Sequence, residues 1–503
     1  MKRNALALVA AALAACALFG SFRLATADRD TKVGNNVLVN PPALIDANNS
    51  PSIVRNPRRP ANVALSYRVD RPGFSAAVAW SEDGGITWGR TALPLPEGKD
   101  RPFAADVAFA PDGILYVTYV HLEGAGNVPA TLWLSSSRDG GRTLSAPIMV
   151  SGRLAFQARL AIARSGAIHV TWLQGREVAL YRFTSVENPI VAVSSTDGGR
   201  TFSRPVQLSD PERERVGVAS PVLDDKDELV VLYEDFKGDR RDFENLEGPA
   251  WSEPFALVIT RSSDGGRTFS KGVEVESGLV PTKRFLVFLP DFPSLAAGPD
   301  GSMFVTWADG RNEDEDAFIR RSDDGGRTWA PPVRVNDNPK GDGTAQYLPM
   351  VAVAPGGRVD VVFLDRRRDR NNVMTDATVA SSHDQGRSFE NVQLSEVSFD
   401  SRVGPSADLK FGVDFGSRLG LVSDDDRSLA AWTDTRLGSE DTGRQYVMAT
   451  AFQIPTPTGG LASVPAIAGL LGLCLLVLAA AWRMGGRGGG ATLTTRNSGP
   501  AGR

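Results

Sequence analysis

A repeated acid-x-arginine motif is the clearest candidate for chemistry in this sequence. It is found as Asp309-Gly-Arg311, Asp365-Arg-Arg367, Asp434-Thr-Arg436 and the variant Gln174-Gly-Arg176. Guanidinium groups match carboxylates with paired hydrogen bonds, so arginines that converge on one point would hold an anionic ligand such as a sugar carboxylate. Alternatively, each arginine pairs with the aspartate of its own motif or of a neighbouring one and holds neighbouring repeat units together. The regular recurrence favours this second interpretation, and the motif residues remain candidates for ligand binding.

Two further sets of residues are candidates for a site. The long segment 234–254 combines charges with aromatic residues, among them Trp251, as a docking surface would, although a disordered charged insertion has the same composition. Acids at comparable places in the repeated units are Asp106, Asp291 and Asp414, with Arg159 and Tyr347 at similar places. Two carboxylates about 5–10 Å apart would suit the acid–base chemistry of a glycosidase. Solvated acids that line a channel explain the same residues without catalysis.

The sequence offers little that would hold a metal or a cofactor. The acidic run 313–316 could supply oxygen ligands to calcium, although a solvated turn has the same composition. The histidines, His121, His169 and His383, lack the spacing of a zinc site or of a histidine-based catalytic centre. We therefore expect no cofactor, with calcium as the one ion to consider.

An eight-residue pattern, Ser-x-Asp-x-Gly-x-(Thr/Ser)-(Trp/Phe/Leu), recurs through the middle of the chain. Its aspartates are Asp83, Asp139, Asp197, Asp264, Asp324 and Asp384, at intervals of 56, 58, 67, 60 and 60 residues. In each copy, here called an octad, the aspartate can accept bonds from the N–H groups of its own loop, and the glycine supplies the positive φ of a tight turn. We therefore assign the six aspartates a structural role. A period of this size indicates supersecondary units arranged in a row or a ring.

Each octad lies in a unit of four short apolar runs, which is typical of antiparallel strands. The second run of the unit recurs seven times, once more than the octad, and the seventh unit lacks a fourth run. Residues 36–39 resemble the fourth runs of the other units and can complete the seventh. The sequence therefore predicts an all-β fold, a seven-bladed β-propeller over residues 36–453 that is closed by the N-terminal strand. In such blades the octads lie on one face and the acid-x-arginine loops on the other.

The octads resemble the Asp-box (BNR) repeats of the sialidase superfamily, and the likeness covers about residues 36–453. The resemblance implies the propeller fold, with the Asp boxes on the face away from the binding site. It leaves the activity open, because the superfamily includes sialidases, other glycosidases, sorting receptors and assembly factors. Sialidase chemistry would further imply an arginine triad, a Tyr–Glu nucleophile pair and an Asp acid/base. The first triad arginine belongs on the first inner strand, where this chain has Ser50-Pro-Ser-Ile-Val54, and its absence argues against hydrolysis of sialic acid.

The N-terminal end of the chain predicts export. Residues 1–27 have a basic start, an apolar run and the small-residue site Ala25-Thr-Ala27, as a cleaved signal peptide does. A lipoprotein processing box at Cys16 and an uncleaved anchor are the alternatives. The other cysteine, Cys474, lies near the C-terminal end, so we expect no disulfide in the propeller.

The C-terminal end predicts a membrane anchor. Residues 461–482 are apolar and uncharged over a length that can span a bilayer as a helix, and a Pro/Thr/Gly linker at 454–460 precedes them. The tail 483–503 carries arginines and no acid, which places it in the cytoplasm. The chain is thus expected to be a single-pass membrane protein with its propeller outside the cytoplasm.

The expected function is binding of a glycan or a protein partner on the face opposite the octads, without catalysis. The alternatives are a sialidase-like glycoside hydrolase and a structural assembly factor for a membrane complex. A formal net charge of −4 gives no basic field that would attract nucleic acid.

Overall fold

The computed structural model describes residues 31–41, 45–124, 126–176, 188–237, 254–280, 292–405 and 415–455. The signal peptide, most of the linker, the membrane span and the tail predicted from the sequence lie outside these ranges, and so does Trp251. Within the ranges, no helix has the length and apolar character needed to cross a membrane.

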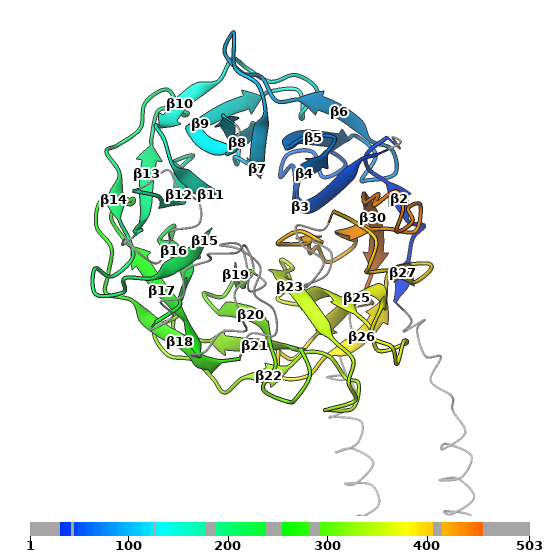
Figure 1. Ribbon diagram of the computed structural model, residues 1–503. Helices are drawn as coiled ribbons and strands as arrows, with labels where there is room; N and C mark the ends of the chain where they lie inside the picture. Colours follow the sequence, from blue (N-terminus) through cyan, green and yellow to red (C-terminus); the bar gives the residue numbers. More distant parts are fainter. Residues whose placement is uncertain are drawn as a thin grey trace, which may run out of the picture. The chain divides into compact units, whose positions relative to one another are not determined.

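The described residues form seven antiparallel sheets arranged around a ring (Figure 1). Blade 1 contains β3 (Ala47–Arg55), β4 (Val63–Arg71), β5 (Ser75–Ser81) and β6 (Gly89–Ala92). Blade 2 contains β7 (Pro102–Phe109), β8 (Leu115–Glu123), β9 (Val128–Ser137) and β10 (Ile148–Ser151). Blade 3 contains β11 (Ala155–Ile162), β12 (Ile168–Gln174), β13 (Ile190–Ser195) and β14 (Val206–Gln207). Blade 4 contains β15 (Val216–Leu223), β16 (Leu229–Asp235), β17 (Phe255–Ser262) and β18 (Val273–Leu279).

The remaining three blades continue the ring. Blade 5 contains β19 (Ser294–Ala297), β20 (Met303–Asp309), β21 (Asp316–Ser322) and β22 (Val333–Arg334). Blade 6 contains β23 (Gln346–Val353), β24 (Val359–Asp365), β25 (Met374–Ser382) and β26 (Glu390–Gln393), and the short β27 (Phe399–Asp400) also pairs with β25. Blade 7 contains β28 (Gly420–Val422), β29 (Ser428–Asp434) and β30 (Tyr446–Gln453), with β1 (Lys32–Val33) and β2 (Val37–Leu38) paired to β30.

The core of the protein lies between neighbouring blades. The second strands β20, β24 and β29 are buried at every residue. One face of each blade is covered by the preceding blade and the other face by the following blade. Between blades 4 and 5, for example, Leu232 packs in one cluster with Val305 and Trp307. This burial explains why the second runs are almost uninterrupted apolar segments in the sequence.

The octads form the turns between third and fourth strands. In the fourth octad, the Ser262 hydroxyl donates to Asp264 Oδ1 at 2.7 Å, and the Thr268 hydroxyl donates to Asp264 Oδ2 at 2.6 Å. The same aspartate accepts the backbone N–H groups of residues 267 and 268, and Gly266 adopts a φ of 84°. The bond from the Thr or Ser hydroxyl to Asp Oδ2 recurs in all six octads. Each octad is therefore a self-contained turn, and its carboxylate is fully used in holding it.

The predicted closure of the ring by residues 36–40 is confirmed. Val37 pairs with Ala449 and Leu38 with Met448, so the N-terminal strand supplies the fourth strand of blade 7. An additional strand, β1, extends this closure with Lys32 paired to Gln453. We call the face that carries the octads the octad face, and the opposite one the loop face. Third strands end at the octad face, so both ends of the described propeller leave the ring there, next to each other.

Candidate functional site

The acid-x-arginine motifs lie where second strands end, on the loop face, and in the three that contain aspartate the arginine pairs with the aspartate of its own motif. Asp309, which is fully buried, accepts two bonds from Arg311, from Nε at 2.8 Å and from Nη2 at 2.6 Å. It also accepts the indole N–H of Trp307 at 2.9 Å. Asp434 repeats this arrangement, since it accepts Trp432 Nε1 at 2.9 Å and Arg436 Nη2 at 2.7 Å. These two motifs thus share the longer pattern Trp-x-Asp-x-Arg, whose tryptophan the sequence prediction overlooked, and the Asp365 motif has Phe363 in that place.

The same arginines also link their blade to the next. Arg311 reaches Glu276 of blade 4 at 3.3 Å. Arg367 pairs with Asp365 at 2.6 Å, with Asp337, and through Nη2 with Asn391 Oδ1 at 2.9 Å. These guanidinium groups therefore do not converge on one point in the structure. The exposed Arg176 lies at the edge of the described residues, with its backbone N–H bonded to Asn188.

A different set of side chains is brought together on the ring axis by bulges in the first strands. Five of these strands, β3, β7, β11, β15 and β23, each contain one extra residue at an equivalent point. A non-glycine residue with φ between 51° and 55° starts each bulge: Ser50, Ala104, Gln157, Val218 and Leu348. Such bulges redirect the side chains that follow and are frequent next to binding sites. The redirected residues, two positions later, are Ser52, Asp106, Arg159, Ser220 and Met350.

All five redirected residues line one cavity of about 150 Å³ in the centre of the ring. Its wall is completed by Arg418 and Gly420 of blade 7, by Phe292 ahead of β19, and by apolar residues such as Leu160. The bulges lie in the first half of strands that begin on the loop face, so the cavity is nearer that face than the octad face. Equivalent positions of different blades thus form a mixed layer of acid, base, hydroxyl and apolar groups.

Asp106 is held firmly in this layer by three blades. Its Oδ1 accepts the Ser52 hydroxyl at 2.9 Å and Arg418 Nη1 at 3.0 Å, and its Oδ2 accepts the Leu160 backbone N–H at 3.0 Å. Arg418 also donates to the carbonyl oxygens of Ser50 and Ala105, at 3.3 and 2.8 Å. Burial lowers the pKa of Arg418, although Asp106 opposes the shift. The Arg418–Asp106 pair therefore connects blades 7, 1 and 2.

Arg159, on the neighbouring bulge, has no such partner among the residues that the structure describes. Its Nη1 donates to the Ala158 carbonyl oxygen at 3.3 Å, and its Cζ atom lies 5.6 Å from the centre of the Phe292 ring. No carboxylate of the described residues is within ion-pair distance of its guanidinium. Desolvation by burial, reinforced by the charge of Arg418, lowers the pKa of Arg159 to about 9. A planar donor group with free N–H bonds is thus available in the cavity.

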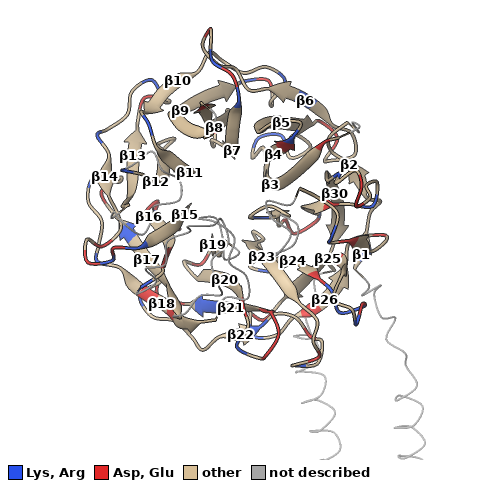
Figure 2. Cartoon of the chain, in the orientation of Figure 1, with Lys and Arg blue, Asp and Glu red and all other residues tan. Residues whose placement is uncertain are grey.

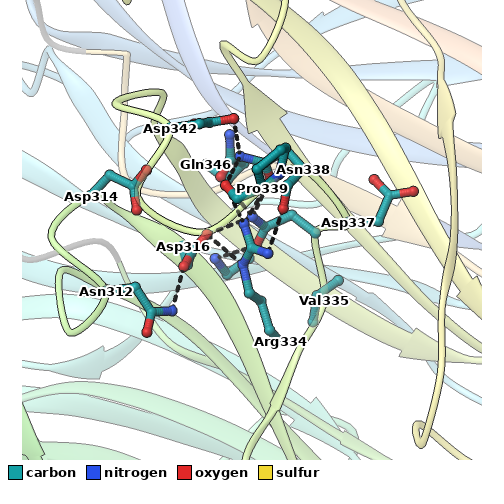
Figure 3. A network of polar contacts seen from close by, with 12 residues as sticks. Asn312, Asp314, Asp316, Arg334, Val335, Asp337, Asn338, Pro339, Asp342 and Gln346 are labelled. Atoms are coloured by element: carbon teal, nitrogen blue, oxygen red, sulfur yellow. Dashed lines mark hydrogen bonds and ion pairs between the residues drawn. The ribbon is translucent and has the colours of Figure 1, made fainter.

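The other sequence candidates fall outside this cavity. Tyr347 is buried and bonded to Arg366 and Thr375, and Asp291 and Asp414 lie outside the described residues. In the part of the chain that the structure describes, no three His, Cys, Asp or Glu residues come together as a metal site would require. In the acidic run 313–316, Asp316 is instead bonded to Asn312, Arg334 and Asn336, within the polar network of Figure 3.

The histidines have structural neighbours. His121 lies 3.0 Å from Glu123 and accepts the indole N–H of Trp133, while His169 contacts the Ser194 hydroxyl at 2.8 Å. Basic and acidic residues are interspersed around the described ring (Figure 2), so a ligand would be recognised by local charge and not by a surface of one sign.

Comparison with known proteins finds only distant likenesses to solved structures. No protein-family model matches the chain, and no curated protein matches its sequence. Among solved structures, a protein of unknown function from Dyadobacter fermentans DSM 18053 is 12% identical with a TM-score of 0.47, over 84% of this chain and 99% of that one. The Hadza microbial sialidase Hz136 is 14% identical with a TM-score of 0.43, over 78% of this chain and 74% of the sialidase. A polysaccharide lyase of family PL25, an ulvan lyase, is 14% identical with a TM-score of 0.48, over 83% of this chain and 93% of the lyase.

Proposed function

We propose that this chain is an exported, membrane-anchored propeller that binds a glycan through its loop face and central cavity, without cleaving it. The observation that carries the proposal is the layer of five bulges, which turns polar side chains from five blades towards one cavity. Local backbone strain of this kind is retained where surrounding structure holds it for a purpose. A site lined by a few directed polar groups among apolar ones is typical of small-ligand and sugar binding.

The state of Asp106 supports binding and not hydrolysis. Glycoside hydrolysis uses two carboxyl groups, one of which must be free to exchange a proton with the substrate. Among the described residues that line the cavity, Asp106 is the one acid, and both of its oxygens are bonded to protein groups. The Asp106 carboxylate is therefore used in joining neighbouring blades.

Export and membrane anchoring rest on the sequence of the two ends. They agree with one feature of the propeller: residues 32 and 453 lie side by side at the octad face. The C-terminal end of the described propeller therefore leaves at the octad face, and the variable loops lie on the opposite face. Loops on a rigid scaffold are where binding residues concentrate.

The experiment is binding of the full-length protein, in detergent micelles, to a panel of neutral and acidic oligosaccharides. Ser220→Trp should block the cavity and abolish binding, and Ser263→Trp, at an exposed position in an octad, should leave it unchanged. The recovered glycans should be intact. A wild-type protein that binds no glycan, or one that shortens the glycan unless Ser220 is replaced, would overturn the proposal. In the first case a protein ligand becomes the leading hypothesis, and in the second a glycoside hydrolase does.

A further inference from the structure

The cavity carries an excess of positive charge among the residues that line it. Arg159 and Arg418 both contribute to its wall, against the single carboxylate of Asp106 within the described residues. Because Asp106 is already paired with Arg418 at 3.0 Å, no carboxylate among the described residues is left to balance the charge of Arg159. A partly buried charge without a partner is costly, and folded proteins retain one where it has a task. One monoanion in the cavity would restore the balance.

The geometry of Arg159 indicates the shape of that anion. The guanidinium lies over the Phe292 ring, so one face is covered, while one of its N–H groups is used by Ala158. Its remaining N–H groups lie in the plane of the guanidinium, where a planar carboxylate accepts two parallel bonds. Arg311 shows the contrasting case, since Asp309 and Glu276 outweigh the effect of burial and raise its pKa. Burial, together with the charge of Arg418, lowers the pKa of Arg159 to about 9, which leaves the group charged at neutral pH.

We infer that Arg159 is the receptor for the carboxylate of a uronic-acid residue in the glycan, whose sugar ring occupies the rest of the cavity. This inference rests on the proposed function and names its ligand. The hydroxyl of Ser220 lines the cavity and makes no hydrogen bond to the described residues, so it is available to a sugar hydroxyl. The ring of Phe292 and the side chain of Met350 offer apolar contact to the C–H face of the sugar.

The cavity, of about 150 Å³, has the size of one that admits benzene in another protein. A sugar ring with its carboxylate is larger than benzene, so the cavity would hold the carboxylate at Arg159 and part of the ring, and the rest of the glycan would extend out of it.

The test is calorimetric titration of the full-length protein with glucuronate, with glucose as the neutral matched sugar and lactate as a small carboxylate without a ring. Glucuronate should bind and glucose should not. Arg159→Met should weaken glucuronate binding by about tenfold to one hundredfold, the range for a lost charge-assisted pair of bonds. Arg159→Lys, which keeps the charge and loses the planar fork, should fall between wild type and Arg159→Met. Arg153→Met, at an exposed arginine of the segment just before β11, is the control and should bind normally.

A second measurement separates loss of binding from loss of fold. Removing an unbalanced, partly buried charge should raise the melting temperature of the ligand-free protein, so Arg159→Met should melt above wild type. Arg358→Met is the matched control, because Arg358 is buried with a paired carboxylate, Asp360 at 2.9 Å, and its loss should lower the melting temperature.

The outcomes distinguish this inference from the proposed function. Undiminished glucuronate binding by a folded Arg159→Met protein would overturn the assignment of Arg159 and leave glycan binding standing. Equal binding of glucose and glucuronate would do the same. Binding of lactate that depends on Arg159, with no sugar bound, would retain a carboxylate site there and overturn both the uronic-acid assignment and the proposed glycan function.

Discussion

The Asn36 side-chain oxygen accepts a hydrogen bond from Arg436 Nη2 at 2.9 Å, across 400 residues of sequence. The same oxygen accepts the backbone N–H of Glu396 at 2.8 Å, and the Asn36 amide donates to the Leu394 carbonyl oxygen at 2.8 Å. One asparagine thus joins the N-terminal strand to blade 6 and to an acid-x-arginine motif of blade 7. In blade 7 the acid-x-arginine motif therefore helps to hold the N-terminal strand in the ring, because Arg436 bonds to Asn36.

Replacement of Asn36 should weaken that closure. Asn36→Ala removes three side-chain bonds and should lower the free energy of unfolding by about 1–3 kcal/mol. Asn35→Ala, at an exposed neighbour, should have little effect. Deletion of residues 28–40 should be far more severe, because it removes the fourth strand of blade 7 altogether. Urea titration followed by tryptophan fluorescence measures each case, and a deletion variant as stable as wild type would contradict the role of the N-terminal strand.

The octad aspartates are expected to stabilise the fold and not to bind ligand. Asp324→Ala leaves two backbone N–H groups and the Thr328 hydroxyl without their acceptor, which should cost about 1–3 kcal/mol of unfolding free energy. Asp323→Ala, next to it and exposed, is the control. Glycan binding by folded Asp324→Ala should equal that of wild type. Loss of binding alone would mean that the octad face carries the site.

Asp309 and Arg311 should behave as a coupled pair in unfolding experiments. Asp309→Ala removes the acceptor of both the Trp307 indole N–H and the Arg311 guanidinium. Loss of one partner of a buried pair lowers the free energy of unfolding by about 3–5 kcal/mol. Arg311→Met should cost less, because Arg311 is the more exposed partner. In the double variant the two effects should be clearly less than additive. Simple additivity would show that the pair makes no net contribution.

The octads should also make stability depend on acid pH. Burial raises the pKa of Asp83, but bonds from Thr87 and Ser81 outweigh it and lower the value to about 2, and Ser388 and Ser382 do the same for Asp384. An unfolded aspartate titrates near about 3.9. The stabilisation is therefore complete above about pH 4 and is lost as the pH falls towards 2. Melting temperatures from pH 5 to 2 should decline in this window, and Asp83→Asn with Asp384→Asn should make the decline shallower.

We expect no turnover of a fluorogenic sialoside. The inner-strand position where a sialidase has an arginine is occupied by Ser50 to Val54, and Arg311 and Arg367 are bonded to their own aspartates. The assay compares wild type with the double variant Arg311→Ala, Arg367→Ala. Robust turnover by wild type that the double variant lacks would establish these arginines as a substrate clamp.

The propeller was predictable because its signals repeat. Each octad is a local device whose residues bond mainly to one another, so its sequence predicts its conformation without knowledge of the rest of the chain. The closure by residues 36–40 followed from counting strands, since a unit without a fourth strand needs one from elsewhere. Arg311 and Arg436 each pair with the aspartate of their own motif, which is the arrangement that the regular recurrence of the motif favoured.

The cavity was less predictable because its geometry depends on bulges. Asp106 and Arg159 stood out in the sequence as charged residues near the ring centre, but Arg418 did not. Each bulge starts at a residue such as Gln157 or Val218 that has no particular preference for positive φ, so its sequence gives no local signal. The conformation is imposed by neighbouring strands. The sequence alone therefore could not predict which arginine lacks a carboxylate partner among the described residues. That assignment required the three-dimensional arrangement.

The pairing of Lys32 with Gln453 makes the polypeptide nearly a closed loop that has been cut at blade 7. Where the cut lies is independent of the cavity, because the bulged strands come from blades 1 to 4 and blade 6. A circular permutation that joined the ends of the described propeller and opened the loop at the octad of blade 5 would move the chain ends two blades round the ring and keep the layer of bulges whole. Evolution or design could therefore relocate the ends of such a propeller without altering its cavity.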